Sequence, residues 1–450
     1  MTKSMTSGNP AKLIFIFALP LIIGNIFQQL YSMADTLIVG RTLGVNALAA
    51  VGCTGSITFF VLGFTMGFTS GLSIITSQRF GADDMEGVKR SFATSLMLCT
   101  ALTIILTIGA FFYTRPILEL LQTPEEIIDD AYSYLIVIFG GIAASIFFNF
   151  LSNMMRALGD SKVPLYFLIL TCILNIILDY ALILLFDMGV AGAGVATIFS
   201  QFVSAICCVI FIRKKMPAFW ISREHFRINK GDISIHLKTA IPMAFQMSII
   251  AIGALILQFA LNGLGPNAVA AYTAAQKIDS IATMPLNSFG AAMATYTAQN
   301  YGAGKIDRIR KGVFQCILMS VGTSIFMGFM NFFFGGTLAS FFVGAEEIEV
   351  LGYAKTFLAI NGVLYWVLAL LFLYRFTLQG LGNSTIPTVA GVMELIMRAL
   401  GGLFLVDWFG FTGAALSNPL AWIGACVPLT IAYYVEIRKL EKSRIPEISC

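Results

Sequence analysis

About a dozen long apolar stretches constrain this chain more than any other feature of its sequence. The hydrocarbon core of a bilayer is about 30 Å thick and is crossed by a helix of roughly 20 apolar residues. Only 12% of the 450 residues are charged, against ~25% in a soluble globular domain. The sequence therefore predicts an all-α membrane protein of twelve transmembrane helices, at about 13–39, 47–75, 91–113, 131–156, 163–186, 190–212, 235–262, 268–296, 313–334, 350–378, 386–406 and 411–435.

The basic residues predict the orientation of these helices. An even number of spans places both termini on one side, and Lys and Arg in short loops favour the cytoplasm. With both termini inside, 23 of the 28 Lys and Arg residues lie in cytoplasmic segments. The most basic segment, Arg213 to Lys238, lies in the middle of the chain. We expect an N-terminal six-helix lobe at 1–212, a cytoplasmic linker at 213–234 and a C-terminal six-helix lobe at 235–450.

The two predicted lobes are related by an internal repeat. When the sequence is shifted by about 221 to 223 residues, five groups of identical or similar residues align in order. The five are Ala18–Pro20 with Ala240–Pro242, Leu43–Ala50 with Leu264–Ala271, Thr76–Ala82 with Thr297–Ala303 (each followed by a basic pair, Lys89–Arg90 and Arg310–Lys311), Leu158–Pro164 with Leu381–Pro387, and Gly189–Ala193 with Gly410–Ala414. Each repeat holds an even number of helices, so we expect pseudo-two-fold symmetry about an axis along the membrane normal.

Two prolines occupy matching places in the first helix of each half. Pro20 and Pro242 each remove a backbone hydrogen bond and permit a bend. Parallel repeats around a central cleft are a recurring transporter design in which one half rocks against the other. The matched prolines are typical of bending points, although static kinks that improve packing would leave the same pattern.

Ionisable residues inside a membrane are costly and are functional candidates unless a partner offsets the cost. Asp35 and Asp179 fall at similar depths near the outer ends of two helices. Asn175 precedes Asp179 by one helical turn, and Thr197 on the next helix reaches the same level. These oxygen-bearing side chains suit a shared proton or a small cation such as sodium. We predict a cation-coupling pocket here, with separate interhelical hydrogen bonds as the alternative.

The C-terminal half carries four other intramembrane charges and no copy of this carboxylate pair. Glu394 and Arg398 are four residues apart on one helix and are expected to form an internal ion pair. Lys277 and Asp279 face different directions, so each needs a partner on another helix, and Lys277 could pair with Glu394. We treat all four as secondary intramembrane charges.

Three motifs make the sequence resemble the multidrug and toxic compound extrusion family, known as MATE transporters, over nearly its whole length. They are Met33–Arg41 (MADTLIVGR), Gln78–Ala82 (QRFGA) and Arg156–Pro164 (RALGDSKVP). The chain is most similar to the subgroup whose acids lie in the N-terminal half, on whose cation-site pattern Asp35, Asn175, Asp179 and Thr197 fall. The acids that another subgroup carries in its seventh and tenth helices are absent.

The resemblance implies a V-shaped fold, a bending point at Pro20, and efflux of organic, often cationic, compounds in exchange for protons or sodium ions by alternating access. We expect no cofactor and no metal other than a coupling sodium ion. The expected partners are small organic substrates and the lipid bilayer, with no nucleic acid, and the expected state is a monomer in the plasma membrane.

Two other functions remain as alternatives. One is a lipid-linked oligosaccharide flippase of the same superfamily, which would be expected to have a charged central cavity or additional helices. The other is a membrane-embedded enzyme, which the sequence disfavours because its only two histidines, His225 and His236, lie in or beside the linker.

Overall fold

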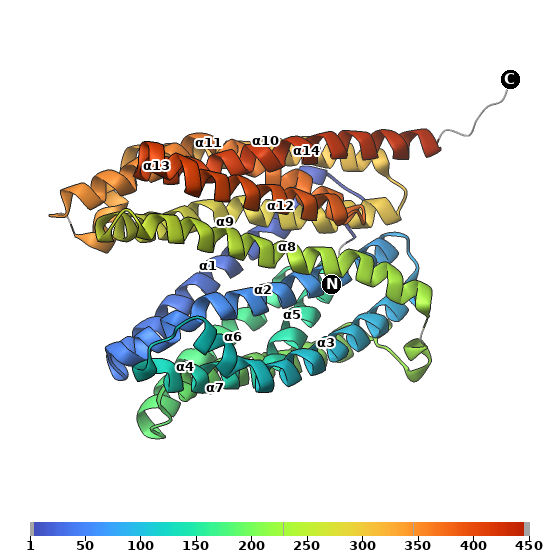
Figure 1. The fold of residues 1–450 in the computed structure, drawn as a ribbon. Helices are drawn as coiled ribbons and strands as arrows, with labels where there is room; N and C mark the ends of the chain where they lie inside the picture. Colours follow the sequence, from blue (N-terminus) through green and yellow to red (C-terminus); the bar gives the residue numbers. More distant parts are fainter. Residues whose placement is uncertain (1–3, 228, 345, 445–450) are drawn as a thin grey trace. The chain divides into compact units, whose positions relative to one another are not determined.

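A computed structural model describes residues 4–227, 229–344 and 346–444. Within these ranges every regular element is a helix, which confirms the predicted fold class (Figure 1). The outermost residues of the two predicted lobes, 1–3 and 445–450, lie outside the described ranges. The first half contains α1 (Pro10–Thr42), α2 (Val45–Gly81), α3 (Met85–Leu120), α4 (Glu125–Gly140), α5 (Ile142–Ala157), α6 (Lys162–Tyr180), η1 (Ala181–Leu185) and α7 (Gly189–Lys215). The second contains α8 (Lys230–Asn262), α9 (Pro266–Gly302), α10 (Ile306–Val343), α11 (Ile348–Gly380), α12 (Thr385–Leu400), η4 (Gly401–Leu405), α13 (Val406–Phe409) and α14 (Phe411–Arg444).

All twelve predicted segments are helical, and most of them meet a strict test for a membrane span. Among the described residues, ten helices are long and apolar enough to cross a bilayer, and an eleventh span is formed if α4 and α5 are counted together. These two helices meet at a 46° bend beside Gly141. The remaining predicted segment is α9, which is 37 residues long. It carries Lys277, Asp279 and a polar end, so it is not apolar enough to be counted among these spans.

The same helix pairings recur in both halves. In the first, α7 packs against α5 and α6, and α2 packs against α3 and α5. In the second, α14 packs against α11 and α12, and α9 packs against α10 and α11. A short π-helical turn follows α6 in one half and α12 in the other, η1 and η4. The internal repeat of the sequence is therefore also a repeat of packing.

Two compact units form within the chain, and their limits differ from the predicted lobe boundaries. The first unit includes residues 23–244, and the second joins residues 4–22 to residues 245–444. Each unit thus contains the beginning of the first helix of the other half. The reason is hydrogen bonding and packing: Met5 N donates to Gln299 Oε1 at 2.8 Å, and Arg308 donates to the carbonyl of Gly8 at 2.9 Å.

The beginning of α8, residues 230–244, packs into the first unit, and this packing depends on two glycines of α2. A Cβ added to Gly67 would lie 2.4 Å from the carbonyl oxygen of Met243, and one added to Gly71 would lie 2.5 Å from the Cα of Ala240. Only glycine allows the backbones of α2 and α8 to approach this closely. Pro20 and Pro242 lie two residues before the points where α1 and α8 pass from one unit to the other.

The linker is shorter than the sequence predicted. Helix α7 continues through Arg213 to Lys215, and α8 already begins at Lys230. Basic side chains in the last turn of a helix interact favourably with its negative C-terminal end, which explains the extension of α7. The linker between them contains two short turns, η2 (Pro217–Phe219) and η3 (Arg223–Phe226).

Candidate cation site in the first unit

The candidate site lies where α1, α6 and α7 meet within the first unit. Asp35 is two turns from the end of α1, and Asp179 is one residue from the end of α6, just before the π-helical turn η1. After η1 the chain reverses through Asp187, whose φ is +51°, and Gly189, whose φ is +57°. This reversal places α7, with Thr197, directly against α6.

The four predicted residues are brought together by these helices. Asn175 Nδ2 donates to Thr197 Oγ1 at 3.3 Å. Asn175 and Asp179 are fully buried, while Asp35 and Thr197 are half-buried. The carboxyl groups of Asp35 and Asp179 lie close enough to interact with each other.

Four acceptor oxygens of this cluster lack hydrogen-bond donors. Both carboxylate oxygens of Asp179, one oxygen of Asp35 and the side-chain oxygen of Asn175 are buried and accept no hydrogen bond. Leaving such groups unsatisfied is costly, and two facing carboxylates also repel each other. A proton shared by the two acids, or a cation bound between them, would remove both costs. All the atoms that could bind a cation here are oxygens, which are the ligands that hard cations such as sodium prefer.

Two tyrosines complete the site and were missed by the sequence reasoning. Tyr31 Oη lies 3.1 Å from Thr197 Oγ1, and either hydroxyl can donate. Tyr31 precedes Asp35 by four residues, so helical spacing could have identified it. Tyr134 on α4 interacts with both Asp35 and Asp179, and no local pattern in the sequence indicates it.

The charges of the second unit are paired in a different way from this cluster. Glu394 accepts a hydrogen bond from Arg375 on α11, and its other carboxylate oxygen lies 3.8 Å from Arg398. The predicted Glu394–Arg398 pair is therefore present but is the weaker of two. Arg375, which lies in the last turns of a predicted span, was overlooked as an intramembrane charge.

Asp279 and Lys277 have separate environments, as their spacing predicted. Asp279 Oδ1 accepts a hydrogen bond from Tyr365 Oη at 2.6 Å, and Tyr365 accepts one from Asn331 at 2.8 Å. Lys277 is exposed and forms no ion pair within the described residues, so it does not pair with Glu394. Asp279 and Glu394 thus have a hydrogen-bond donor or a cation beside them, whereas Asp179 has neither among the described residues.

Comparison with known proteins decides the family. The MatE family model matches residues 20–181 and matches again at residues 242–403. The chain belongs to the MatE family. The double match also confirms the internal repeat, because one model describes both halves.

Curated relatives of this MATE chain are named as drug-resistance proteins. It is 32% identical over 368 residues to the probable multidrug resistance protein YpnP of Bacillus subtilis, a match that covers 80% of this chain and 82% of the relative. It is 26% identical to the multidrug export protein MepA of Staphylococcus aureus, covering 88% and 89% of the two chains. This MATE chain is accordingly a multi-pass membrane protein of a transporter family, which is not a class of enzymes.

Solved MATE structures share the fold. A crystal structure of a MATE protein in complex with MaL6 covers 98% of this chain and all of its own, with a TM-score of 0.91 and 22% identity. An outward-facing multidrug resistance MATE transporter of the MOP superfamily also reaches a TM-score of 0.91, at 22% identity, with 98% and 99% of the chains covered. At this identity the similarity establishes the architecture.

Proposed function

We propose that this protein exports organic, often cationic, compounds across the plasma membrane in exchange for protons or sodium ions. The observation that carries the proposal is the pair of Asp35 and Asp179, because three of their four carboxylate oxygens are buried without a hydrogen-bond donor. The names of the relatives support multidrug efflux as the direction of transport. Both termini lie in the cytoplasm, and the transporter acts as a monomer.

The site couples ion binding to transport because its carboxylates have no counter-charge within the protein. With the pocket empty of protons and cations, facing carboxylates repel, which favours a wider arrangement of α1 against α6. Binding of a proton or a sodium ion draws Asp35 toward Asp179, and a sodium ion can in addition be liganded by the oxygens of Asn175 and Thr197. The position of α1 therefore depends on the occupancy of the pocket.

Pro20 links this local change to the second unit. Residues before position 23 of α1 belong to the second unit, and Asp35 belongs to the first. A shift of the outer part of α1 is absorbed where the missing amide of Pro20 weakens the helix. Alternating access then follows from bending at this position.

Efflux from proteoliposomes tests the proposal. Purified protein is reconstituted, and transport of a fluorescent organic cation is measured with proton and sodium gradients imposed separately. Asp179→Asn should abolish gradient-driven transport. The matched control is Asp187→Asn, eight residues further on at an exposed position, and its transport should equal that of the wild type. Full transport by Asp179→Asn under either gradient would refute the assignment of the coupling site.

A further inference from the structure

The beginning of α1 is held by side chains of the second unit. The guanidinium of Arg308, in the first turn of α10, donates to the carbonyl oxygens of Met5 at 3.3 Å and of Gly8 at 2.9 Å. Asn300, near the end of α9, donates to the same carbonyl of Met5 at 3.2 Å. Arg308 Nε also donates to Asn300 Oδ1 at 3.0 Å, which fixes the two side chains relative to each other. We call Arg308 and Asn300 the α1 clamp.

The segment before α1 is fastened along its whole length. The bonds of the α1 clamp end on main-chain carbonyls, and the amide of Met5 in turn donates to Gln299 at 2.8 Å. Two turns of chain later, the amide of Ala11 donates to Gln315 at 2.8 Å. The Met5 side chain is only 2% exposed and belongs to the core of the second unit. The second unit therefore binds this segment mainly through its backbone.

The beginning of α8 is held in the first unit by another arginine. Arg79, in the last turn of α2, forms an ion pair with Asp232 in the first turn of α8 and donates to the carbonyl of Gly87 at 2.9 Å. One turn further along α8, His236 is fully buried and its ring lies 2.7 Å from Ser91 Oγ. We call Arg79 and Asp232 the α8 clamp.

The two clamps occupy the same place in the internal repeat. A shift of 221 residues, which aligns the ends of α2 and α9, places Arg79 opposite Asn300 and Gly87 opposite Arg308. In the first unit the arginine reaches from the helix before the loop to the helix after it, and in the second unit it reaches back from the helix after the loop. The same contact made from opposite sides of the loop indicates a role that both units share.

A helix that passes from one unit to the other transmits motion only if both of its parts are attached. Residues 10–22 of α1 belong to the second unit and residues 23–42 to the first. The outer part carries Asp35, whose attachment to α6 depends on the occupancy of the cation site. The α1 clamp contains no acid and bonds main-chain carbonyls, so a proton or a sodium ion does not change it. The clamp is thus a permanent attachment and the cation site a conditional one, with Pro20 between them.

We infer that Arg308 and Arg79 are positioning residues for transport, which hold the beginnings of α1 and α8 as fixed ends while each helix bends at its proline. This inference rests on the proposed function, because the fixed end converts the ion-driven shift of the outer part of α1 into a movement of the second unit. Without the α1 clamp, ion binding still closes the cation site, but the beginning of α1 yields in place of the second unit.

Turnover measured beside ion binding tests this inference. In proteoliposomes Arg308→Gln should leave the KM for a fluorescent organic cation unchanged and lower kcat about tenfold, the factor that corresponds to roughly one lost charge-assisted hydrogen bond. The rise in unfolding temperature with added sodium or with falling pH, which reports ion binding, should equal that of the wild type. Arg308→Lys keeps the charge but not the fork that reaches two carbonyls, so it should recover part of kcat.

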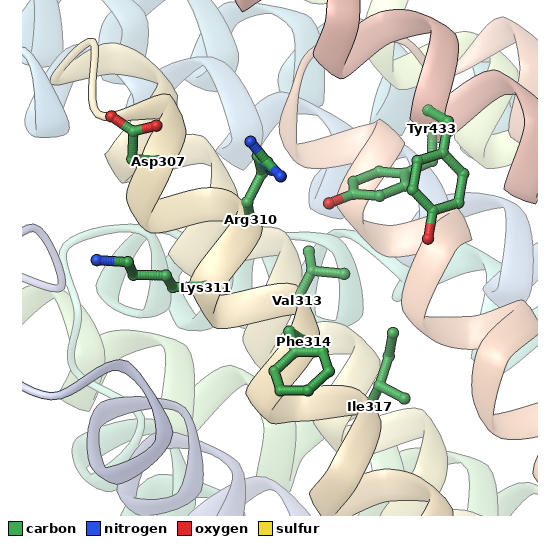
Figure 2. Close-up of a pocket in the computed structure, with 8 residues that line it drawn as sticks. Asp307, Arg310, Lys311, Val313, Phe314, Ile317 and Tyr433 are labelled. Carbon is green, nitrogen blue, oxygen red and sulfur yellow. The ribbon is translucent and has the colours of Figure 1, made fainter.

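The matched control is Arg310→Gln, two residues further along α10. Figure 2 shows Arg310 in the pocket between α10 and α14, where it pairs with Glu441 at 2.8 Å. This variant should transport like the wild type. A kcat of Arg308→Gln equal to that of the control would overturn the inference, and so would a loss of ion-dependent stabilisation together with kcat, as expected of a residue that only maintains the fold. A wild type without gradient-driven efflux would instead refute the proposed function.

Locking the clamp tests the inference without removing any of its bonds to Met5. Lys305 Nζ donates to the carbonyl of Thr6 at 3.0 Å, so cysteines at these two positions can be joined by a short bifunctional thiol reagent in a chain whose eight native cysteines are replaced by alanine. A fixed end tolerates locking, so transport should be the same before and after cross-linking. Loss of transport on cross-linking would show that the beginning of α1 leaves the second unit during the cycle, and would overturn the inference even if Arg308→Gln did not fold.

Discussion

Replacing a buried acid by its amide should destabilise the second unit but not the first. Glu394 is 4% exposed and lies between two cations, Arg375 and Arg398. In Glu394→Gln the amide keeps the volume but both guanidinium groups lose their counter-charge. Removing one partner of a buried ion pair costs about 3–5 kcal/mol, because an uncompensated charge stays buried. Asp179 has no cation beside it, so Asp179→Asn should leave the free energy of unfolding unchanged or raise it.

Equilibrium unfolding by SDS in bicelles measures both variants on one scale. We expect Glu394→Gln to lower the free energy of unfolding by about 3–5 kcal/mol. The double variant Glu394→Gln/Arg375→Met should recover part of the loss, because it also removes one of the two unpaired guanidinium groups. A cost below about 1 kcal/mol for Glu394→Gln, the value typical of an exposed pair, would refute the view that these charges stabilise the second unit.

Three further changes test other parts of the structure. Gly71→Ala should destabilise the first unit by about 1–3 kcal/mol, because its Cβ would overlap the backbone of α8. Gly109→Ala, which has open space around it, should not lower the unfolding temperature. Equal effects of the two variants would contradict the close approach of α2 and α8. Pro20→Ala should reduce transport turnover with normal expression, and unchanged turnover would leave Pro20 a packing residue. In intact cells an impermeant thiol reagent should label a cysteine placed at Glu126 and not one placed at Lys215, and the reverse pattern would invert the predicted topology.

Local patterns in the sequence predicted the helices, and helical spacing predicted which residues of the candidate site lie together on one helix. Apolar length placed the long helices, and the four-residue spacing of Asn175 and Asp179 put both on one face of α6. The same rule would have added Tyr31 to Asp35. The 46° bend between α4 and α5 was not predicted, because the repeat-equivalent helix α11 is continuous and the local residues, two glycines among apolar neighbours, are common in straight spans.

Partners on distant helices could not be read from the sequence. Arg375 stands near the end of an apolar stretch, where a basic residue ordinarily reaches water, and only the packing of α11 against α12 brings it to Glu394. Tyr134 contributes to the cation site from α4 for the same reason. The exchange of α1 and α8 between the units also depends on contacts far apart in the chain, such as that of Met5 with Gln299.

This exchange sets an order for biosynthesis. When the ribosome has produced α1 to α7, the first unit still lacks residues 230–244 of α8, and Gly67 and Gly71 face an unfilled surface. Residues 4–22 have at that stage no second unit to pack against. Neither half can complete its packing before the other half has been made, so a nascent chain stopped after α7 should remain a substrate for membrane quality-control proteases. Expressing the two halves as separate polypeptides should restore a packed protein only when both are present in the same membrane.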